Sequence, residues 1–81
     1  MIMEFEEIIN RLKEIISQSL ETKKIYDKDV AYALELDPQY FAVIKKRKKI
    51  PFEAIAYFSH NNHQNMNWIL FGNNNNKNPK L

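Results

Sequence analysis

One stripe of side chains in the segment 38–48 has the chemistry needed to read bases in a nucleic-acid groove. The spacing i, i+3, i+4 and i+7 puts its members on one helix face, and they are Gln39, Ala42, Val43 and Lys46. Gln pairs bidentately with adenine, Ala or Val contacts the methyl group of thymine, and Lys reaches guanine or a phosphate. An exposed Val43 gains nothing on a face that meets only solvent, whereas on a groove-reading face it can contact a base. The stripe therefore predicts base contacts.

Cations follow at the end of this segment and directly after it, in the run Lys45-Lys46-Arg47-Lys48-Lys49. Residues 1–40 hold five Lys/Arg against nine Asp/Glu, a net −4, and residues 41–81 hold seven against one, a net +6. A basic second half suits a polyanion as partner. We expect the run to hold phosphates and so to position the domain without reading sequence, although a solvated lysine-rich face is the alternative. The residues predicted to contact phosphate are Lys28, Tyr40, Lys45, Arg47, Lys48 and Lys49.

Other kinds of chemistry find little support in the residues. His60 and His63 are three apart, but the chain has no cysteine and few acidic residues near them, so we predict no metal site. Gly72 is the single glycine, which excludes a glycine-rich phosphate loop. No carboxylate pair or Ser–His grouping lies in a catalytic context. We expect neither an enzyme nor a cofactor, and no small-molecule substrate is evident.

The length of 81 residues corresponds to one small domain. No run of 18 or more apolar residues occurs, so no membrane span is expected, and the acidic start of the chain is unlike a signal peptide. A cytoplasmic protein is predicted.

The pattern of apolar residues and helix-starting residues predicts an all-α fold of five helices. Residues 4–20 have one apolar stripe at helical spacing. Asp27 is the expected N-cap of a second helix, and Asp37-Pro38 starts a third that runs to about Lys48. Pro51 opens a fourth, and a fifth spans 66–71 and ends at Gly72. Residues 73–81 are predicted to be an Asn-rich disordered tail or linker.

The second and third helices fit the requirements of a helix-turn-helix. Such a motif needs a small residue where the helices cross, which Ala31 supplies, and an outer face open to a groove. It also needs a shared apolar core, for which the candidates are Val30, Leu34, Leu36, Phe41 and Ile44.

At these residues the chain resembles the helix-turn-helix domain of bacteriophage CI-type repressors, within the lambda-repressor-like family. The resemblance covers about residues 4–72 and gives a domain of residues 1–72. Its motifs are Asp29-Val30-Ala31-Tyr32-Ala33-Leu34, Phe41, Ile44-Lys45-Lys46-Arg47, Ile50-Pro51-Phe52-Glu53 and Asn67-Trp68-Ile69-Leu70-Phe71-Gly72. In two places the chain departs from the family pattern. Glu35 stands in the turn that usually carries a glycine with positive φ, and Val43 stands where a small polar residue is usual.

The resemblance implies a lambda-repressor-like five-helix bundle that binds double-stranded DNA as a transcriptional repressor of the phage or prophage type. It implies a homodimer on a two-fold operator, with recognition helices in major grooves about 34 Å apart. The site of action would be the nucleoid, in the cytoplasm of a bacterial host. A rival interpretation is a small adaptor that binds a protein partner through the face of segment 38–48. The three large residues Trp68, Leu70 and Phe71 are expected in the core, with dimer contact as the alternative.

Overall fold

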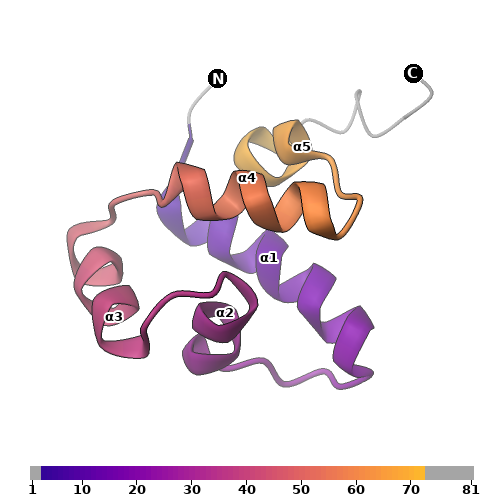
Figure 1. Cartoon of the computed structure of the whole chain (residues 1–81), viewed down its shortest axis with the longest axis horizontal. Coiled ribbons are helices and arrows are strands. Elements are labelled where there is room, and N and C mark those ends of the chain that lie inside the picture. Colours follow the sequence, from indigo (N-terminus) through magenta and orange to yellow (C-terminus); the bar gives the residue numbers. More distant parts are fainter. Residues whose placement is uncertain (1–2, 73–81) are drawn as a thin grey trace.

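The computed structural model describes residues 3–72, and in that range the chain forms five α-helices and no β-strand. The helices are α1 (Phe5–Leu20), α2 (Asp27–Ala33), α3 (Pro38–Arg47), α4 (Phe52–Asn61) and α5 (Met66–Phe71) (Figure 1). The predicted all-α class and the predicted number of helices are confirmed. The tail predicted at 73–81 lies outside the described residues.

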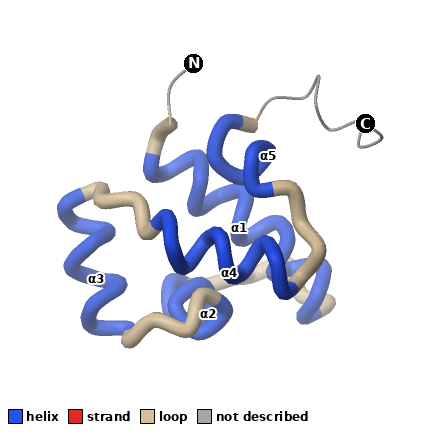
Figure 2. The backbone as a smooth tube through the Cα atoms, turned by 45° about the horizontal axis from the view of Figure 1, so that its top comes forward, coloured by secondary structure: helices blue, strands red, loops and turns tan. Residues whose placement is uncertain are grey.

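Helix α1 is the longest element, and it lies behind α4 while contacting α2 and α5 (Figure 2). Most of its predicted apolar stripe packs into the bundle, with Ile8 and Leu12 fully buried, whereas Leu20 at the end of the helix is exposed. Arg11, on the same helix, donates hydrogen bonds from Nε to the carbonyl of Ile69 (2.7 Å) and from Nη2 to the carbonyl of Leu70 (3.2 Å). These bonds satisfy carbonyls that the end of α5 leaves without helical partners. Helix α5 is thereby fixed against α1.

The connection between α2 and α3 is a tight C-terminal cap followed by a helix start. The amide of Leu36 donates to the carbonyl of Ala31 (2.8 Å), and the amide of Glu35 donates to the carbonyl of Tyr32 (3.0 Å). This pair of bonds is a Schellman motif, which needs a left-handed residue at the position of Glu35. Glu35 has φ 58°, so a glutamate occupies a conformation that glycine adopts without strain.

The start of α3 follows the prediction closely. Pro38 is its first residue, and the side chain of Asp37 accepts hydrogen bonds from the amides of Gln39 (3.0 Å) and Tyr40 (3.2 Å). Capping by aspartate together with proline at the first helical position fixes where the helix begins. Its end differs by one residue, because Lys48 turns left-handed at φ 55° and α3 stops at Arg47.

Two predicted helix starts are shifted by one residue. Asp27 lies inside α2 instead of capping it, and Tyr26 is the N-cap residue. The carboxylate of Asp29 accepts a hydrogen bond from the amide of Tyr26 (2.8 Å), which leaves the Asp27 carboxylate available for other partners. Pro51 occupies the N-cap position of α4 without a capping hydrogen bond from its side chain, and Phe52 is the first helical residue.

The core lies between α1 and the shorter helices. Phe41 and Ile44 bring α3 into it, and both are 2% exposed. Leu70 is buried, whereas Trp68 and Phe71, which the sequence pattern predicts in the core, are half-buried and pack against it. The remaining buried apolar side chains are Phe5, Ile8, Ile9, Leu12, Ile16, Val30, Ala31, Leu34, Ile55, Phe58 and Ile69.

Candidate nucleic-acid interface

The outer face of α3 is open over its whole length. Gln39, Ala42, Val43 and Lys46 are all exposed, and Val43 has 49% of its surface accessible. The opposite face of the same helix is buried through Phe41 and Ile44. Helix α3 stands at one edge of the bundle (Figures 1 and 2), so its outer face is free to meet a large partner. The structure thus brings the four predicted base-reading residues together on one accessible surface.

The predicted phosphate contacts flank this stripe on both sides. At about 100° per residue, Tyr40 and Arg47 fall on one side of the stripe and Lys45 falls on the other. Tyr40 and Lys49 line a surface hollow of about 690 Å³ toward α4, whereas Lys45 and Lys48 line a separate hollow of about 640 Å³ toward α1 and α2. A helix that lies in a groove has one phosphate strand on each side, and cations on both flanks suit that geometry.

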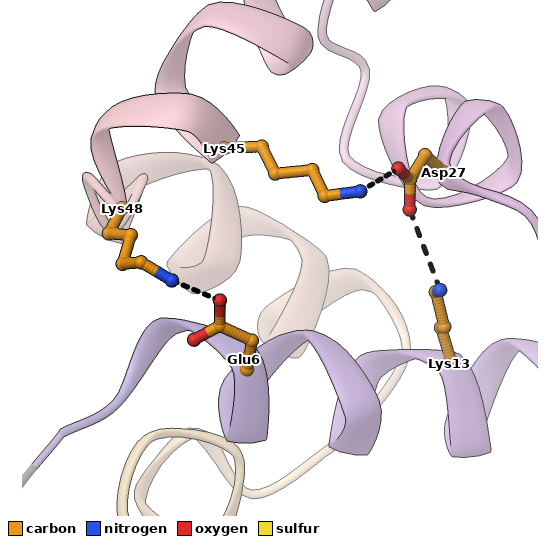
Figure 3. A network of polar contacts seen from close by, with 5 residues as sticks. All are labelled: Glu6, Lys13, Asp27, Lys45 and Lys48. Carbon is orange, nitrogen blue, oxygen red and sulfur yellow. Dashed lines mark hydrogen bonds and ion pairs between the residues drawn. The ribbon is translucent and has the colours of Figure 1, made fainter.

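The cations of α3 and its C-cap differ in what they contact. The ammonium groups of Lys45 and Lys48 form ion pairs with carboxylates of other helices (Figure 3). Lys45 pairs with Asp27 at the start of α2, and Lys48 pairs with Glu6 in the first turn of α1. Arg47 and Lys49 are exposed and form no ion pair within residues 3–72, and the same holds for Lys28 on α2.

Asp27 is shared between two lysines. Its Oδ2 atom pairs with Lys45, and its Oδ1 atom lies 3.5 Å from the Nζ atom of Lys13 on α1 (Figure 3). This single carboxylate therefore connects α1, α2 and α3. Its position within the first turn of α2 also places it near the positive end of that helix, where a negative charge is favourable.

The ion pairs lower the pKa of both carboxyl groups. The hydrogen bond from Lys48 lowers the pKa of Glu6 below its ordinary value, against a smaller opposing effect of desolvation. The hydrogen bond from Lys45 likewise lowers the pKa of Asp27, with a further contribution from the charge of Lys13. Both carboxylates are therefore ionised at neutral pH.

The residues of these ion pairs and part of the predicted base-reading stripe line the same hollow, the one toward α1 and α2. Ala42 and Lys46 of the stripe line it together with the two carboxylates. It combines four lysines with two acidic residues, and Phe41 forms part of its wall. The full lining consists of Glu6, Asp27, Lys28, Pro38, Phe41, Ala42, Lys45, Lys46 and Lys48.

Glu6 and Asp27 are the residues of this surface that the sequence did not reveal. Glu6 is 42 positions from Lys48, so no local spacing connects the two. The sequence pattern assigns Asp27 to a helix cap, which accounts for its charge without a partner in α3. Only the packing of α1 and α2 against α3 makes these carboxylates part of the surface.

The two histidines lie away from any metal-binding arrangement. His60 and His63 are exposed, and His63 has φ 55° in the turn after α4, where the amide of Gln64 donates to the carbonyl of Ser59 (2.8 Å). Within residues 3–72, no group of three or more His, Cys, Asp or Glu side chains is placed to hold a metal ion. None of the helices in this range is long and apolar enough to cross a membrane.

Comparisons with protein-family models, with curated proteins and with solved structures find no match to this chain. The resemblance to phage repressor domains therefore rests on its residues and motifs alone and stays a prediction.

Proposed function

We propose that this chain binds double-stranded DNA in a sequence-specific manner, with α2 and α3 forming a helix-turn-helix and α3 lying in the major groove. The observation that carries the proposal is the two-faced character of α3. One face is buried through Phe41 and Ile44, while the other exposes an amide, two small apolar groups and a cation. A major groove admits one α-helix, and base edges offer partners for each of these groups.

In this proposal, the residues of the stripe read bases and the flanking cations position the helix. Gln39 is suited to adenine, and Val43 is suited to a thymine methyl. Four exposed residues are available to phosphate oxygens: Lys28, Tyr40, Arg47 and Lys49. Lys45 and Lys48 become available to phosphate when they leave their carboxylate partners.

The biological role in the proposal is repression by a homodimer on a two-fold operator, as the resemblance to phage repressors implies. Two copies of α3 about 34 Å apart would enter successive major grooves on one side of the duplex. A protein in that position blocks access of RNA polymerase to an overlapping promoter. The bacterial cytoplasm, at the nucleoid, is the corresponding location.

A second candidate function is an adaptor that binds a protein partner. The hollow of about 690 Å³ beside α4 favours it, because three exposed aromatic side chains line this surface: Tyr40, Phe52 and Tyr57. Aromatic residues are enriched at the centres of protein interfaces. A partner bound there would also cover one flank of α3.

The two candidates are distinguished by selecting sites for the full chain from random duplex DNA and measuring the binding stoichiometry. The DNA-binding proposal expects one enriched two-fold motif bound by two chains, together with weaker, salt-dependent binding of random duplex. If no duplex binds even at low salt, the DNA-binding proposal is wrong and the adaptor becomes the better candidate.

A further inference from the structure

We infer that Glu6 and Asp27 compete with DNA phosphates for Lys48 and Lys45, and so lower the affinity of this domain for every duplex. The inference rests on the proposed function and assigns a role to two residues outside the recognition helix. Glu6 comes from α1 and Asp27 from α2, and each pairs with a lysine of α3 or its C-cap. Two independent elements therefore place a carboxylate on the same flank of the predicted groove-reading face.

The exposure of both pairs makes such an exchange feasible. The side chains of Glu6 and Lys48 are 65% and 62% exposed, and those of Asp27 and Lys45 are 41% and 52% exposed. Exposed ion pairs contribute little to the stability of a fold, so their loss on binding is tolerated. Phosphate oxygens can then replace the carboxylate oxygens at each ammonium group.

The position of the two carboxylates determines which charges a bound duplex would lie against. Both line the hollow that also contains Ala42 and Lys46 of the base-reading stripe. A phosphate strand on this flank approaches Lys45 and Lys48 and the two negative charges beside them. Asp27 keeps a cation when Lys45 leaves, because Lys13 lies 3.5 Å away, whereas Glu6 has no second ion-pair partner within residues 3–72.

The consequence is a sequence-independent reduction of affinity. The carboxylates neutralise two lysines that would otherwise displace counterions from the phosphates of any duplex. They line a hollow whose lining includes neither Gln39 nor Val43. Base contacts therefore supply a larger share of the affinity for the selected site, because the electrostatic contribution from this flank is partly cancelled in the free protein.

The test compares Glu6→Gln, Asp27→Asn and the double variant with Glu14→Gln in the full chain. Glu14 is an exposed residue of α1 that forms no ion pair within residues 3–72. Its variant removes one negative charge, as each single variant does, but breaks no ion pair. Each protein is titrated with a random-sequence duplex and with the selected site over a series of salt concentrations. Thermal unfolding establishes that each variant is folded.

We expect Glu6→Gln and Asp27→Asn each to bind both duplexes about 2- to 5-fold more tightly than wild type at low salt, the range that corresponds to an exposed ion pair. The slope of log K against log salt should steepen by about 0.9 for each further phosphate that the freed lysines neutralise. Glu14→Gln should show a smaller gain. Carboxyl resonances of Glu6 and Asp27 should report a higher pKa in the DNA complex than in the free protein, because the lysines have left them.

Three results would overturn the inference, and they bear differently on the proposed function. Variants that bind like Glu14→Gln would show that the carboxylates do not compete, while DNA binding by the wild type would stand. Weaker binding by folded variants would show instead that the pairs position α3. No binding of any duplex by any of the proteins would overturn both proposals together.

Discussion

Phe41 and Val43 lie two residues apart on α3, yet the ring of Phe41 is 2% exposed and the side chain of Val43 is 49% exposed. Apolar side chains thus occupy both faces of one ten-residue helix. Burial explains Phe41, which packs with Ile44 against the rest of the core. Core packing does not account for the exposed side chain of Val43. The fold therefore requires Phe41, whereas Val43 is available for the proposed function.

Alanine substitutions at these two positions should affect stability very differently. Phe41→Ala should lower the free energy of unfolding by about 3–5 kcal/mol, because a buried aromatic ring is removed and a cavity is left. Val43→Ala should change it by no more than about 0.5 kcal/mol, as at other exposed sites. Chemical denaturation of both variants measures the difference. Equal effects at the two positions would contradict the orientation of α3 in the bundle.

Glu35→Gly should stabilise the protein by up to about 1 kcal/mol. The left-handed backbone at φ 58° strains any residue with a Cβ atom, and glycine removes that strain. The matched control is Glu14→Gly in the middle of α1, where the same change should destabilise by about 0.5–1 kcal/mol. Melting temperatures give the comparison, and a lower value for Glu35→Gly than for wild type would show that the Glu35 side chain stabilises the turn in another way.

The positions of the helices could be predicted from the sequence better than the contacts that their charged side chains make. Helical spacing of apolar residues in α1 and the pair Asp37-Pro38 before α3 have local physical causes, so both could be inferred from adjacent residues. The ends of helices were less certain, because whether Asp27 or Tyr26 caps α2 depends on a hydrogen bond to Asp29. The exposure of the α3 stripe followed from its angular separation from Phe41 and Ile44.

The ion pairs of α3 could not be predicted, because they depend on tertiary packing. The charges along the chain divide into an acidic first half and a basic second half, with no sign that Lys45 and Lys48 contact that acidic half. The same limit applies to Arg11, whose hydrogen bonds reach α5 from 58 and 59 residues away.

The ion pairs should make part of the stability depend on pH. Glu6 and Asp27 have a lower pKa in the folded protein than their ordinary values, so their contribution is present at neutral pH and disappears as the pH falls through the folded pKa. The stability difference between wild type and the Glu6→Gln, Asp27→Asn double variant should therefore shrink as the pH falls from about 5 to about 2. Denaturation of both proteins across this range measures it. A difference that stays constant would show that ion pairing does not lower the pKa of these carboxyl groups in the folded protein.

Neutralising exposed cations should weaken binding to all duplexes alike. The Arg47→Gln, Lys49→Gln double variant removes two exposed charges that form no ion pair within residues 3–72. The slope of log K against log salt should become shallower by about 0.9 for each phosphate that is no longer neutralised. Lys23→Gln, an exposed lysine in the connection before α2, serves as the control. A loss of affinity confined to one sequence would assign base reading to Arg47 or Lys49 in place of phosphate binding.

The central claim is that the outward face of α3 reads bases, and Gln39 tests it most directly. Gln39 is exposed and uncharged, and the hydrogen bond that its backbone amide donates to Asp37 does not involve its side chain. Gln39→Ala should therefore leave the fold intact and hardly change the affinity for random duplex.

The decisive measurement is a titration of wild type, Gln39→Ala and Val43→Ala against the selected site and every single-base change of it. We expect Gln39→Ala to lose about 1–3 kcal/mol on the selected site and to lose its preference at one base pair, where the wild type favours adenine. Val43→Ala should lose less binding free energy, and only at a base pair whose thymine methyl group the Val43 side chain contacts. Unchanged base preferences in both folded variants would contradict the account, because residues other than Gln39 and Val43 would then read the bases.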